Sequence, residues 1–271
     1  MGDLKVTPLA PAEPDTAQPD TVALFVSDLH LHVAMPRTAQ AFFNFLQHQA
    51  RRSQQLYLLG DIFEYWAGDD DIATPFNQHV VSTIRAISAA GVAVFWMAGN
   101  RDFLVGDRFA AATGVRLLPD PVVTQIAGYR MVLTHGDAQC TDDRAYMEFR
   151  ARVRSQDWQQ KFLALPLAER KAIIADLRSG SREAQRSKSS DIMDVNAGAI
   201  ATLFDTTDTE VMIHGHTHRP ACHRYPAHPS PRVRYVLPDW DCDAAVQRGG
   251  WIGISADGAI RRFDVNGHAL S

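Results

Sequence analysis

Five apolar runs in this chain each end in a short polar group that contains Asp, His or Asn. Runs of this length bounded by turn residues are typical of buried strands. In open α/β sheets, ligands bind at the carboxyl ends of the strands, where such polar groups would gather. The pattern therefore predicts a layered α/β sandwich with one polar site at its strand ends. The runs lie at residues 22–26, 56–59, 92–98, 131–133 and 211–213.

Helices are predicted between the first strands, where apolar residues recur three or four positions apart. Pro36 suits the first turn of one helix, and residues 76–90 form another that stops at Gly91. Residues 140–204 are helical in pattern and include a polar, basic segment at 179–190. We interpret this interval as a helical cap inserted into the sandwich; an ordinary pair of packed helices with a solvated loop is the alternative. Later strands are predicted at 233–237, 251–254 and 260–265.

Composition excludes several classes of protein. The 271 residues are 46% hydrophobic and carry a net charge of −4, so we expect a soluble globular protein with no nucleic-acid partner. Three widely spaced cysteines predict neither a disulfide framework nor a zinc ribbon, and they favour a reducing, cytosolic compartment. Residues 1–20 hold four prolines and no apolar signal core, and no stretch reaches the roughly 18 apolar residues that span a membrane. We expect a disordered tail at 1–20 and a single domain at 21–271.

The polar groups supply the ligand types of a transition-metal site. Carboxylates and imidazoles together suit Mn²⁺, Fe²⁺ or Zn²⁺ better than Ca²⁺. Asp-x-His and His-x-His each place two side chains on one side of an extended segment. Seven candidates exceed the needs of one metal, so we predict two metals that share the Asp61 carboxylate. The candidates are Asp28, His30, Asp61, Asn100, His135, His216 and His218.

Each of these residues alone is more often a turn residue, a helix cap or a satisfied core group. The ordered set of five groups, and three histidines within residues 214–218, is what indicates a dinuclear site. We interpret His214 as a support for the ligands rather than a ligand, and we assign no role to His32.

The five groups resemble the sequence blocks of the calcineurin-like metallophosphoesterases, from about residue 22 to residue 218. The common third block of that family is Gly-Asn-His, and Arg101 stands where its histidine would be. This departure excludes a histidine acid at that position. The Arg-containing block is similar to the UDP-2,3-diacylglucosamine hydrolase family of lipid A biosynthesis, as are the stretches 28–31, 60–66, 140–143, 187–189, 192–196 and 214–220.

The resemblance implies an αββα sandwich of two mixed sheets with a helical cap inserted at about 140–204. It implies Mn²⁺-dependent hydrolysis of the pyrophosphate bond of UDP-2,3-diacylglucosamine, giving 2,3-diacylglucosamine 1-phosphate (lipid X) and UMP. A metal-activated water would attack the α phosphorus. Two Mn²⁺ ions per chain and peripheral association with the cytoplasmic face of the inner membrane are also implied, and we expect a monomer.

The resemblance also implies a role for each matching residue. One metal would be held by Asp28, His30, Asp61 and His218, and the second by Asn100, His135 and His216 with Asp61 as the bridge. The catalytic set would be Asp61, Asn100, Arg101 and His135. Substrate contacts would come from Asn100, Arg101, Asp143, Ser181, Gln185, Lys188 and His216. The apolar residues Phe162, Leu163 and Leu165 are our candidates for a wall against the acyl chains or for a patch that faces the membrane.

Two alternative functions stay open. The first is another dinuclear-metal phosphodiesterase or nucleotide pyrophosphatase, a group that usually has histidine where Arg101 stands. The second is a non-catalytic scaffold that kept the fold, and such scaffolds usually lose ligands from the five blocks. Every ligand is present here.

Overall fold

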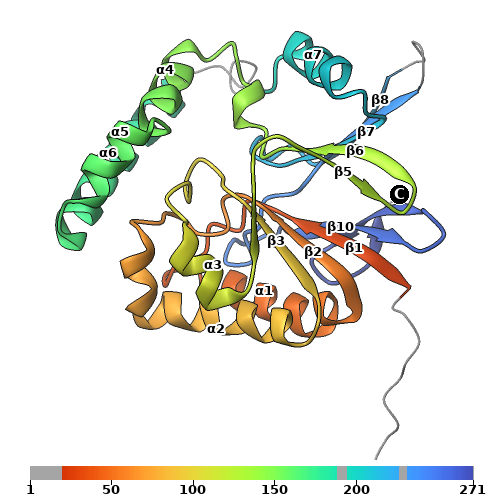
Figure 1. Ribbon diagram of the computed structural model, residues 1–271, viewed down its shortest axis with the longest axis horizontal. Helices are drawn as coiled ribbons and strands as arrows, with labels where there is room; N and C mark the ends of the chain where they lie inside the picture. Colours follow the sequence, from red (N-terminus) through yellow and green to blue (C-terminus); the bar gives the residue numbers. More distant parts are fainter. Residues whose placement is uncertain (1–19, 188–193, 226–230, 271) are drawn as a thin grey trace, which may run out of the picture.

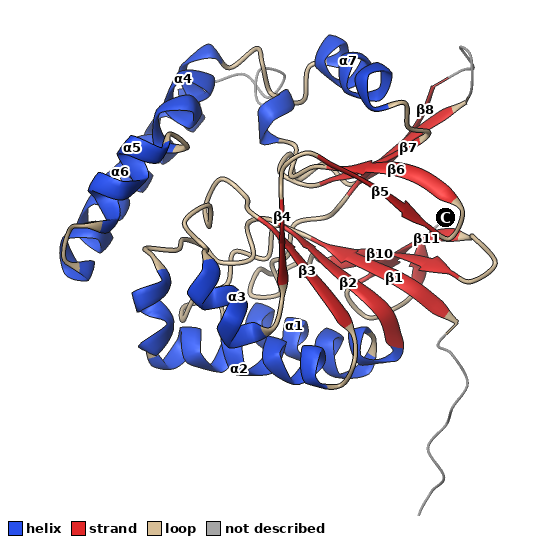
Figure 2. Cartoon of the chain, in the orientation of Figure 1, coloured by secondary structure: helices blue, strands red, loops and turns tan. Residues whose placement is uncertain are grey.

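Two β-sheets lie face to face at the centre of the molecule, with helices on their outer faces (Figures 1 and 2). The computed structural model describes residues 20–187, 194–225 and 231–270, without the side chains of 179–187. The tail predicted at 1–20 lies, apart from Asp20, outside the described residues.

The larger sheet has seven strands in the order β12-β11-β10-β1-β2-β3-β4. The run β1 to β4 is parallel, whereas β10 pairs with β1 in the antiparallel sense, so the sheet is mixed. Helices α1 (Pro36–His48), α2 (Pro75–Ala89) and α3 (Asp107–Thr113) cover its outer face. The strands are β1 (Thr21–Val26), β2 (Ser53–Leu59), β3 (Ala93–Met97), β4 (Arg116–Leu118), β10 (Gly250–Ser255), β11 (Ile260–Asp264) and β12 (Ala269–Leu270).

The smaller sheet has five strands in the order β5-β6-β7-β9-β8. Its central strands β6, β7 and β9 are parallel, and both edge strands are antiparallel. Helix α7 (Ala197–Thr207) covers its outer face by packing Ile200 and Phe204 against Val132 and Met212. The predicted αββα sandwich is confirmed. The strands are β5 (Val122–Ile126), β6 (Tyr129–Leu133), β7 (Val211–His214), β8 (Ala221–Tyr225) and β9 (Arg232–Val236).

Burial on both faces explains why the central strands are continuous apolar runs. In β2, Leu56 and Leu58 face the helices, whereas Tyr57 and Leu59 face the other sheet. A strand covered on both sides needs apolar residues at successive positions, since its side chains alternate between faces. The runs therefore predict the strands, and the turn residues after them lie at the ends of the sheets.

Three helices form an arm beside the sandwich (Figure 1). They are α4 (Arg144–Val153), α5 (Gln156–Leu163) and α6 (Leu167–Ser187). Arg170 of α6 is buried and its guanidinium contacts the Ala67 carbonyl and Asp70, while Lys171 Nζ lies 2.5 Å from Asp71 Oδ1. These contacts join the arm to the loop after β2. No helix in the described part of the chain is both long and apolar enough to cross a membrane.

Candidate metal centre and adjoining cavity

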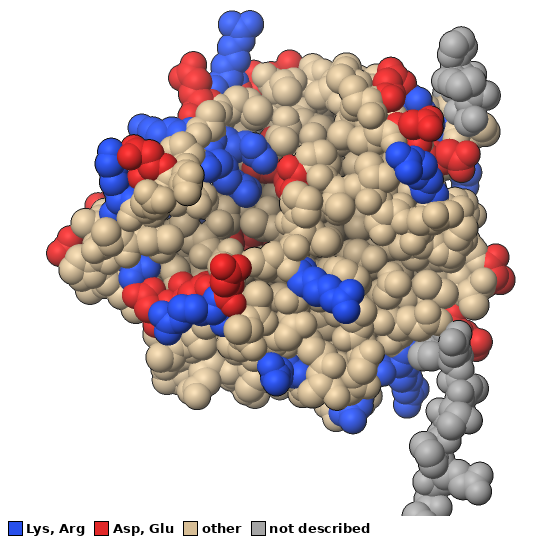
Figure 3. All heavy atoms as spheres, in the orientation of Figure 1, with Lys and Arg blue, Asp and Glu red and all other residues tan. Residues whose placement is uncertain are grey.

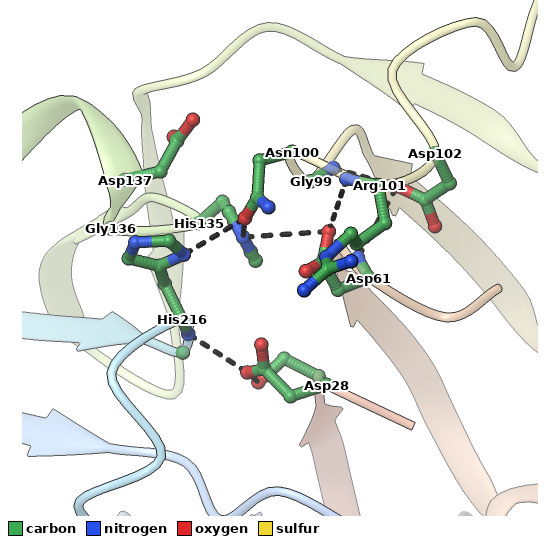
Figure 4. A network of polar contacts seen from close by, with 12 residues as sticks. Asp28, Asp61, Gly99, Asn100, Arg101, Asp102, His135, Gly136, Asp137 and His216 are labelled. Carbon is green, nitrogen blue, oxygen red and sulfur yellow. Dashed lines mark hydrogen bonds and ion pairs between the residues drawn. The ribbon is translucent and has the colours of Figure 1, made fainter. Parts of the chain in front are cut away.

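The predicted ligands come together at the carboxyl ends of β1, β2, β3, β6 and β7. Figure 4 shows Asp28, Asp61, Asn100, His135 and His216 of this set. Asp28, His30 and His218 form one group whose ligand atoms lie within 4.8 Å of one another. The Nε2 atoms of His30 and His218 are 3.2 Å apart, and His218 Nε2 is 3.4 Å from Asp28 Oδ1. This group combines one carboxylate with two imidazoles, as the first predicted metal requires.

A second group lies beside the first. Asp28, Asp61 and His135 place ligand atoms within 4.8 Å of one another. Asn100 Oδ1 is 3.0 Å from His135 Nε2 and 2.9 Å from His216 Nδ1, so the remaining candidates gather around the amide oxygen. Asp28 belongs to both carboxylate-containing groups and Asp61 to one, and the assignment of Asp61 as the bridge stays a prediction.

The chemistry of this donor set fits two divalent cations. Asp28 Oδ2 accepts from Ser27 Oγ at 2.5 Å and from the His216 backbone N–H at 2.8 Å. Asp28 Oδ1 is buried and accepts no hydrogen bond from the described residues, although His218 Nε2 lies 3.4 Å away. Leaving a buried carboxylate oxygen without a donor is costly, and a bound cation would remove that cost.

Outer contacts orient two of the histidines. His135 Nδ1 lies 2.9 Å from the Leu59 carbonyl oxygen, which can only accept, so Nδ1 carries the proton and Nε2 turns its lone pair into the site. His30 Nδ1 lies 3.3 Å from Glu64 Oε2, and Arg178 of the arm contacts the same carboxylate. Partners of this kind are typical of histidines that bind metals.

The backbone adopts a left-handed conformation, with positive φ, at most of the predicted ligands. Among the described residues, seven non-glycine positions have positive φ, and five of them are predicted ligands. Such a conformation costs about 1 kcal/mol or more per residue and persists where the surrounding structure holds it, commonly at functional sites. The five are Asp28, His30, Asp61, His216 and His218, with φ between 49° and 67°.

Two glycines allow the ligand loops to approach one another. A Cβ atom at Gly99 would lie 2.2 Å from both the backbone nitrogen and Oδ1 of Asp61. A Cβ atom at Gly215 would lie 2.2 Å from Asp28 Oδ2 and from Ser27 Oγ. Both distances are far below contact, so only glycine fits beside the two carboxylates.

A cavity of about 940 Å³ opens next to the metal centre, between the strand ends and the arm. Figure 3 shows the surface hollowed between the arm, at the left of the view, and the sandwich. One end of the cavity is polar and includes Asp61, Asn100 and Arg101. The remaining wall is largely apolar and includes Phe103, Leu104, Phe149, Trp158, Phe162 and Ile174. The arrangement can hold a molecule that has a phosphate group at one end and a long apolar part at the other.

Residues 22–220 match the family described as calcineurin-like phosphoesterase. A UDP-2,3-diacylglucosamine hydrolase from Aromatoleum aromaticum is 48% identical over 88% of this chain and 96% of that protein. Proteins of the same name from Bordetella parapertussis and Escherichia coli are 47% and 44% identical, over 88% and 86% of this chain and 93% and 95% of theirs. The chain belongs to the UDP-2,3-diacylglucosamine hydrolase family of calcineurin-like phosphoesterases. The family resemblance drawn from the sequence blocks is thereby confirmed.

The structure places several of the substrate contacts implied by that family along the cavity. Asn100, Arg101, Asp143 and His216 line it. Asp143 also caps α4, because its Oδ1 accepts from the Tyr146 backbone N–H at 3.1 Å. Ser181 and Gln185 lie on α6 with side chains that are not described, and Lys188 lies outside the described residues. Their roles stay predictions.

Of the three residues predicted for the acyl wall or a membrane-facing patch, one lines the cavity, and the role of all three stays a prediction. Phe162 lines the cavity. Leu163 has 41% of its surface exposed, and Leu165 packs against the core on the helix side of the large sheet, so neither belongs to the cavity wall. Periodicity identified the arm as apolar but did not indicate which of its residues face the site.

A buried polar network behind the family's histidine block was not predicted. Asp137 accepts from the Tyr146 hydroxyl at 2.6 Å and from Arg150 Nε at 2.8 Å, and the Tyr146 ring stacks on His216 at 5.9 Å between centroids. Burial alone would raise the pKa of Asp137, but the charges of nearby histidines and of Arg150 hold it well below its ordinary value. The network connects α4 of the arm to a ligand.

His214 lies behind the ligands. Arg234 Nη1 donates to its Nε2 at 2.9 Å, and its Nδ1 lies 2.8 Å from the Gly215 carbonyl oxygen. Burial and the neighbouring Arg234 lower the pKa of His214 to about 3, so the ring is neutral at physiological pH. Both ring nitrogens are occupied by these partners.

Asp102 has a structural role that was not assigned from the sequence. Its buried carboxylate accepts from the backbone N–H groups of Gly99 and Ile62 at 2.8 Å and of Asp61 at 3.2 Å. The second and third blocks are thereby held together at the metal centre. The sequence feature that could have indicated this role is the position of Asp102 at the end of the Gly-Asn-Arg-Asp block.

Replacing Asp102 by alanine is expected to lower the free energy of unfolding by about 3 kcal/mol, because several buried N–H groups lose their acceptor. Urea unfolding followed by circular dichroism measures the change. Asp205→Ala is the control, since its side chain is 68% exposed and pairs with Arg232 at the surface. We expect less than about 0.5 kcal/mol from the control. Equal stability of the two variants would contradict the proposed role.

Proposed function

We propose that this protein hydrolyses the pyrophosphate bond of UDP-2,3-diacylglucosamine, giving 2,3-diacylglucosamine 1-phosphate and UMP, as a step of lipid A biosynthesis. One observation carries the proposal: the metal-ligand cluster and a large apolar chamber share a single cavity. A nucleotide without lipid would leave the apolar wall exposed to water, whereas two acyl chains would cover it.

The seven ligands would hold two divalent cations, which we propose to be Mn²⁺. When bound, such a pair lowers the pKa of water and offsets negative charge on phosphoryl oxygens. Metal analysis of protein loaded in equimolar Mn²⁺, Fe²⁺ and Zn²⁺ tests the choice of ion, because the mixed carboxylate and imidazole set is compatible with all three.

Two residues of the third block would bind the phosphates. Asn100 Oδ1 lies against His135 and His216, so the amide Nδ2 is the group that remains to donate to a phosphoryl oxygen. Arg101 lines the same cavity, and its planar guanidinium matches phosphate oxygens. The leaving group is a phosphate monoester and hence a weak base, which is consistent with the absence of histidine at position 101.

We further propose that the arm brings the protein to the cytoplasmic face of the inner membrane as a monomer. Leu163, Ile173 and Leu177 of the arm are 36–41% exposed. Exposed apolar side chains beside a lipid-sized cavity would assist transfer of the substrate from the bilayer. Co-sedimentation with anionic vesicles tests this association.

The test of the reaction compares three substrates with Mn²⁺-loaded protein. These are UDP-2,3-diacylglucosamine, a dinucleoside polyphosphate and bis(p-nitrophenyl) phosphate. We expect kcat/KM for UMP release from the lipid to exceed the other two values by about 100-fold or more, because only the lipid fills the apolar chamber. Comparable values would favour a general phosphodiesterase, and an inert, metal-free protein would favour the scaffold.

A further inference from the structure

A second cavity, of about 500 Å³, adjoins the metal centre where the ends of β9, β10 and β11 meet. His218 lines both this cavity and the one under the arm. In the large sheet, the ligand-bearing strands β1, β2 and β3 lie between β10 and β4 (Figure 2). The arm cavity includes residues that follow β3, whereas the second cavity is built on β10 and β11. The two cavities therefore flank the metal centre.

The wall of the second cavity is largely apolar, like that of the arm cavity, but it also brings a group of charged side chains close to the metal centre. Two guanidinium groups, from Arg248 and Arg262, line this cavity beside the Asp239 carboxylate. Arg248 Nε and Nη2 donate to Asp239 Oδ2 at 3.1 and 3.0 Å, and the same oxygen lies 3.9 Å from His218 Nδ1. Apolar and aromatic side chains form most of the rest of the wall, among them Val236, Pro238, Trp251, Ile252, Phe263 and Leu270. Hydrogen-bonding groups beside aromatic side chains suit a heterocycle and a ribose.

We propose that the second cavity binds the nucleoside half of the substrate, an inference that rests on the proposed function. The pyrophosphate must lie at the metal centre, and the two ends of the molecule differ sharply in polarity. The two acyl chains match the chamber under the arm, which at about 940 Å³ is the larger of the two cavities, so the uridine extends toward β10 and β11. Arg262 can donate to uracil carbonyl oxygens, and Asp239 can accept from ribose hydroxyls. A volume of about 500 Å³ is within the range of small-molecule sites.

The test measures binding of two phosphate monoesters to the Mn²⁺-loaded protein by titration calorimetry. UMP carries the nucleoside, and methyl phosphate carries only the phosphate. We expect UMP to bind the wild type at least about tenfold tighter. In Arg262→Gln, the ratio should fall below about threefold while methyl phosphate affinity stays within about twofold. Arg261→Gln is the matched control, because Arg261 precedes Arg262 on β11, is exposed and is not part of the described cavity wall.

Two results would overturn the proposal. One is equal affinity of the wild type for UMP and methyl phosphate. The other is a UMP preference that survives in Arg262→Gln, which would place the nucleoside elsewhere. Thermal unfolding checks that Arg262→Gln is folded. If Arg262→Gln is unfolded, Arg248→Gln replaces it in the test, because it removes the second guanidinium of the cavity. Failure of the proposed function is seen separately, as no UMP release from UDP-2,3-diacylglucosamine by a protein that still prefers UMP in the binding test.

Discussion

Asp61→Ala is expected to reduce UMP release from UDP-2,3-diacylglucosamine by about 10³-fold or more. The Asp61 carboxylate is buried, and its Oδ1 lies 3.7 Å from His135 Nε2 and accepts from the Arg101 backbone N–H at 2.7 Å. Its removal deletes a predicted bridge between the two metals and a contact that positions the third block. Steady-state kinetics in Mn²⁺ buffer measures the loss.

The metal content of two alanine variants decides whether Asp61 or Asp28 bridges the two metals. If Asp61 is shared, Asp61→Ala should lose both ions after dialysis, whereas Asp28→Ala should keep the ion near His135 and Asn100. If instead Asp28→Ala loses both ions and Asp61→Ala keeps one, Asp28 is the bridge. Asp28 belongs to both ligand groups, so this result is compatible with the geometry. Asp205→Ala is the control for an exposed carboxylate and should keep two ions and full activity. Retained activity in Asp61→Ala would contradict the two-metal assignment.

Leu177→Asp is expected to lower kcat/KM for the lipid substrate by about 30- to 150-fold, or roughly 2–3 kcal/mol. Leu177 lines the arm cavity and is 39% exposed, so the fold should tolerate the change. A carboxylate there would have to lose water against an acyl chain. The same variant should cleave bis(p-nitrophenyl) phosphate at the wild-type rate, because that substrate has no acyl chains.

Leu163→Asp is the matched control for Leu177→Asp. Leu163 lies on the same arm and is 41% exposed, but it is not among the described residues of the cavity wall. Its variant should keep lipid turnover in detergent within about twofold of wild type, as is usual for surface substitutions. Equal losses in the two variants would show that the acyl chains do not lie in this cavity.

Most of the central strands could be predicted because they are buried on both faces. The runs at 56–59 and 92–98 lie within or around β2 and β3, and the helix predicted at 76–90 is α2 within one residue at each end. The edge strands β4, β5, β8 and β12 and the short helix α3 were not predicted. Edge strands lack the continuous burial that produces an apolar run, as the exposed pattern of β8 illustrates. A helix of two turns has too few positions to show a period.

The seven candidate ligands could also be predicted from the sequence, since residue type and position after a strand identify them. The directions of their side chains could not be predicted, because they depend on the tertiary structure. The left-handed backbone at Asp61 lies beside N–H contacts from residues 61–63 to the Asp102 carboxylate, which is 39–41 residues away in the sequence. No local propensity predicts a conformation that costs energy in isolation.

The division is clearest in the two cavities. By itself, the sequence determined the central strands, the five polar blocks and an apolar helical segment, because each depends on residues close along the chain. The tertiary structure decided that Leu177 rather than Leu163 faces the apolar chamber, and that Arg248 and Arg262 stand beside His218. Those juxtapositions depend on how helices and sheets pack, and packing joins residues whose separation along the chain carries no periodic signal.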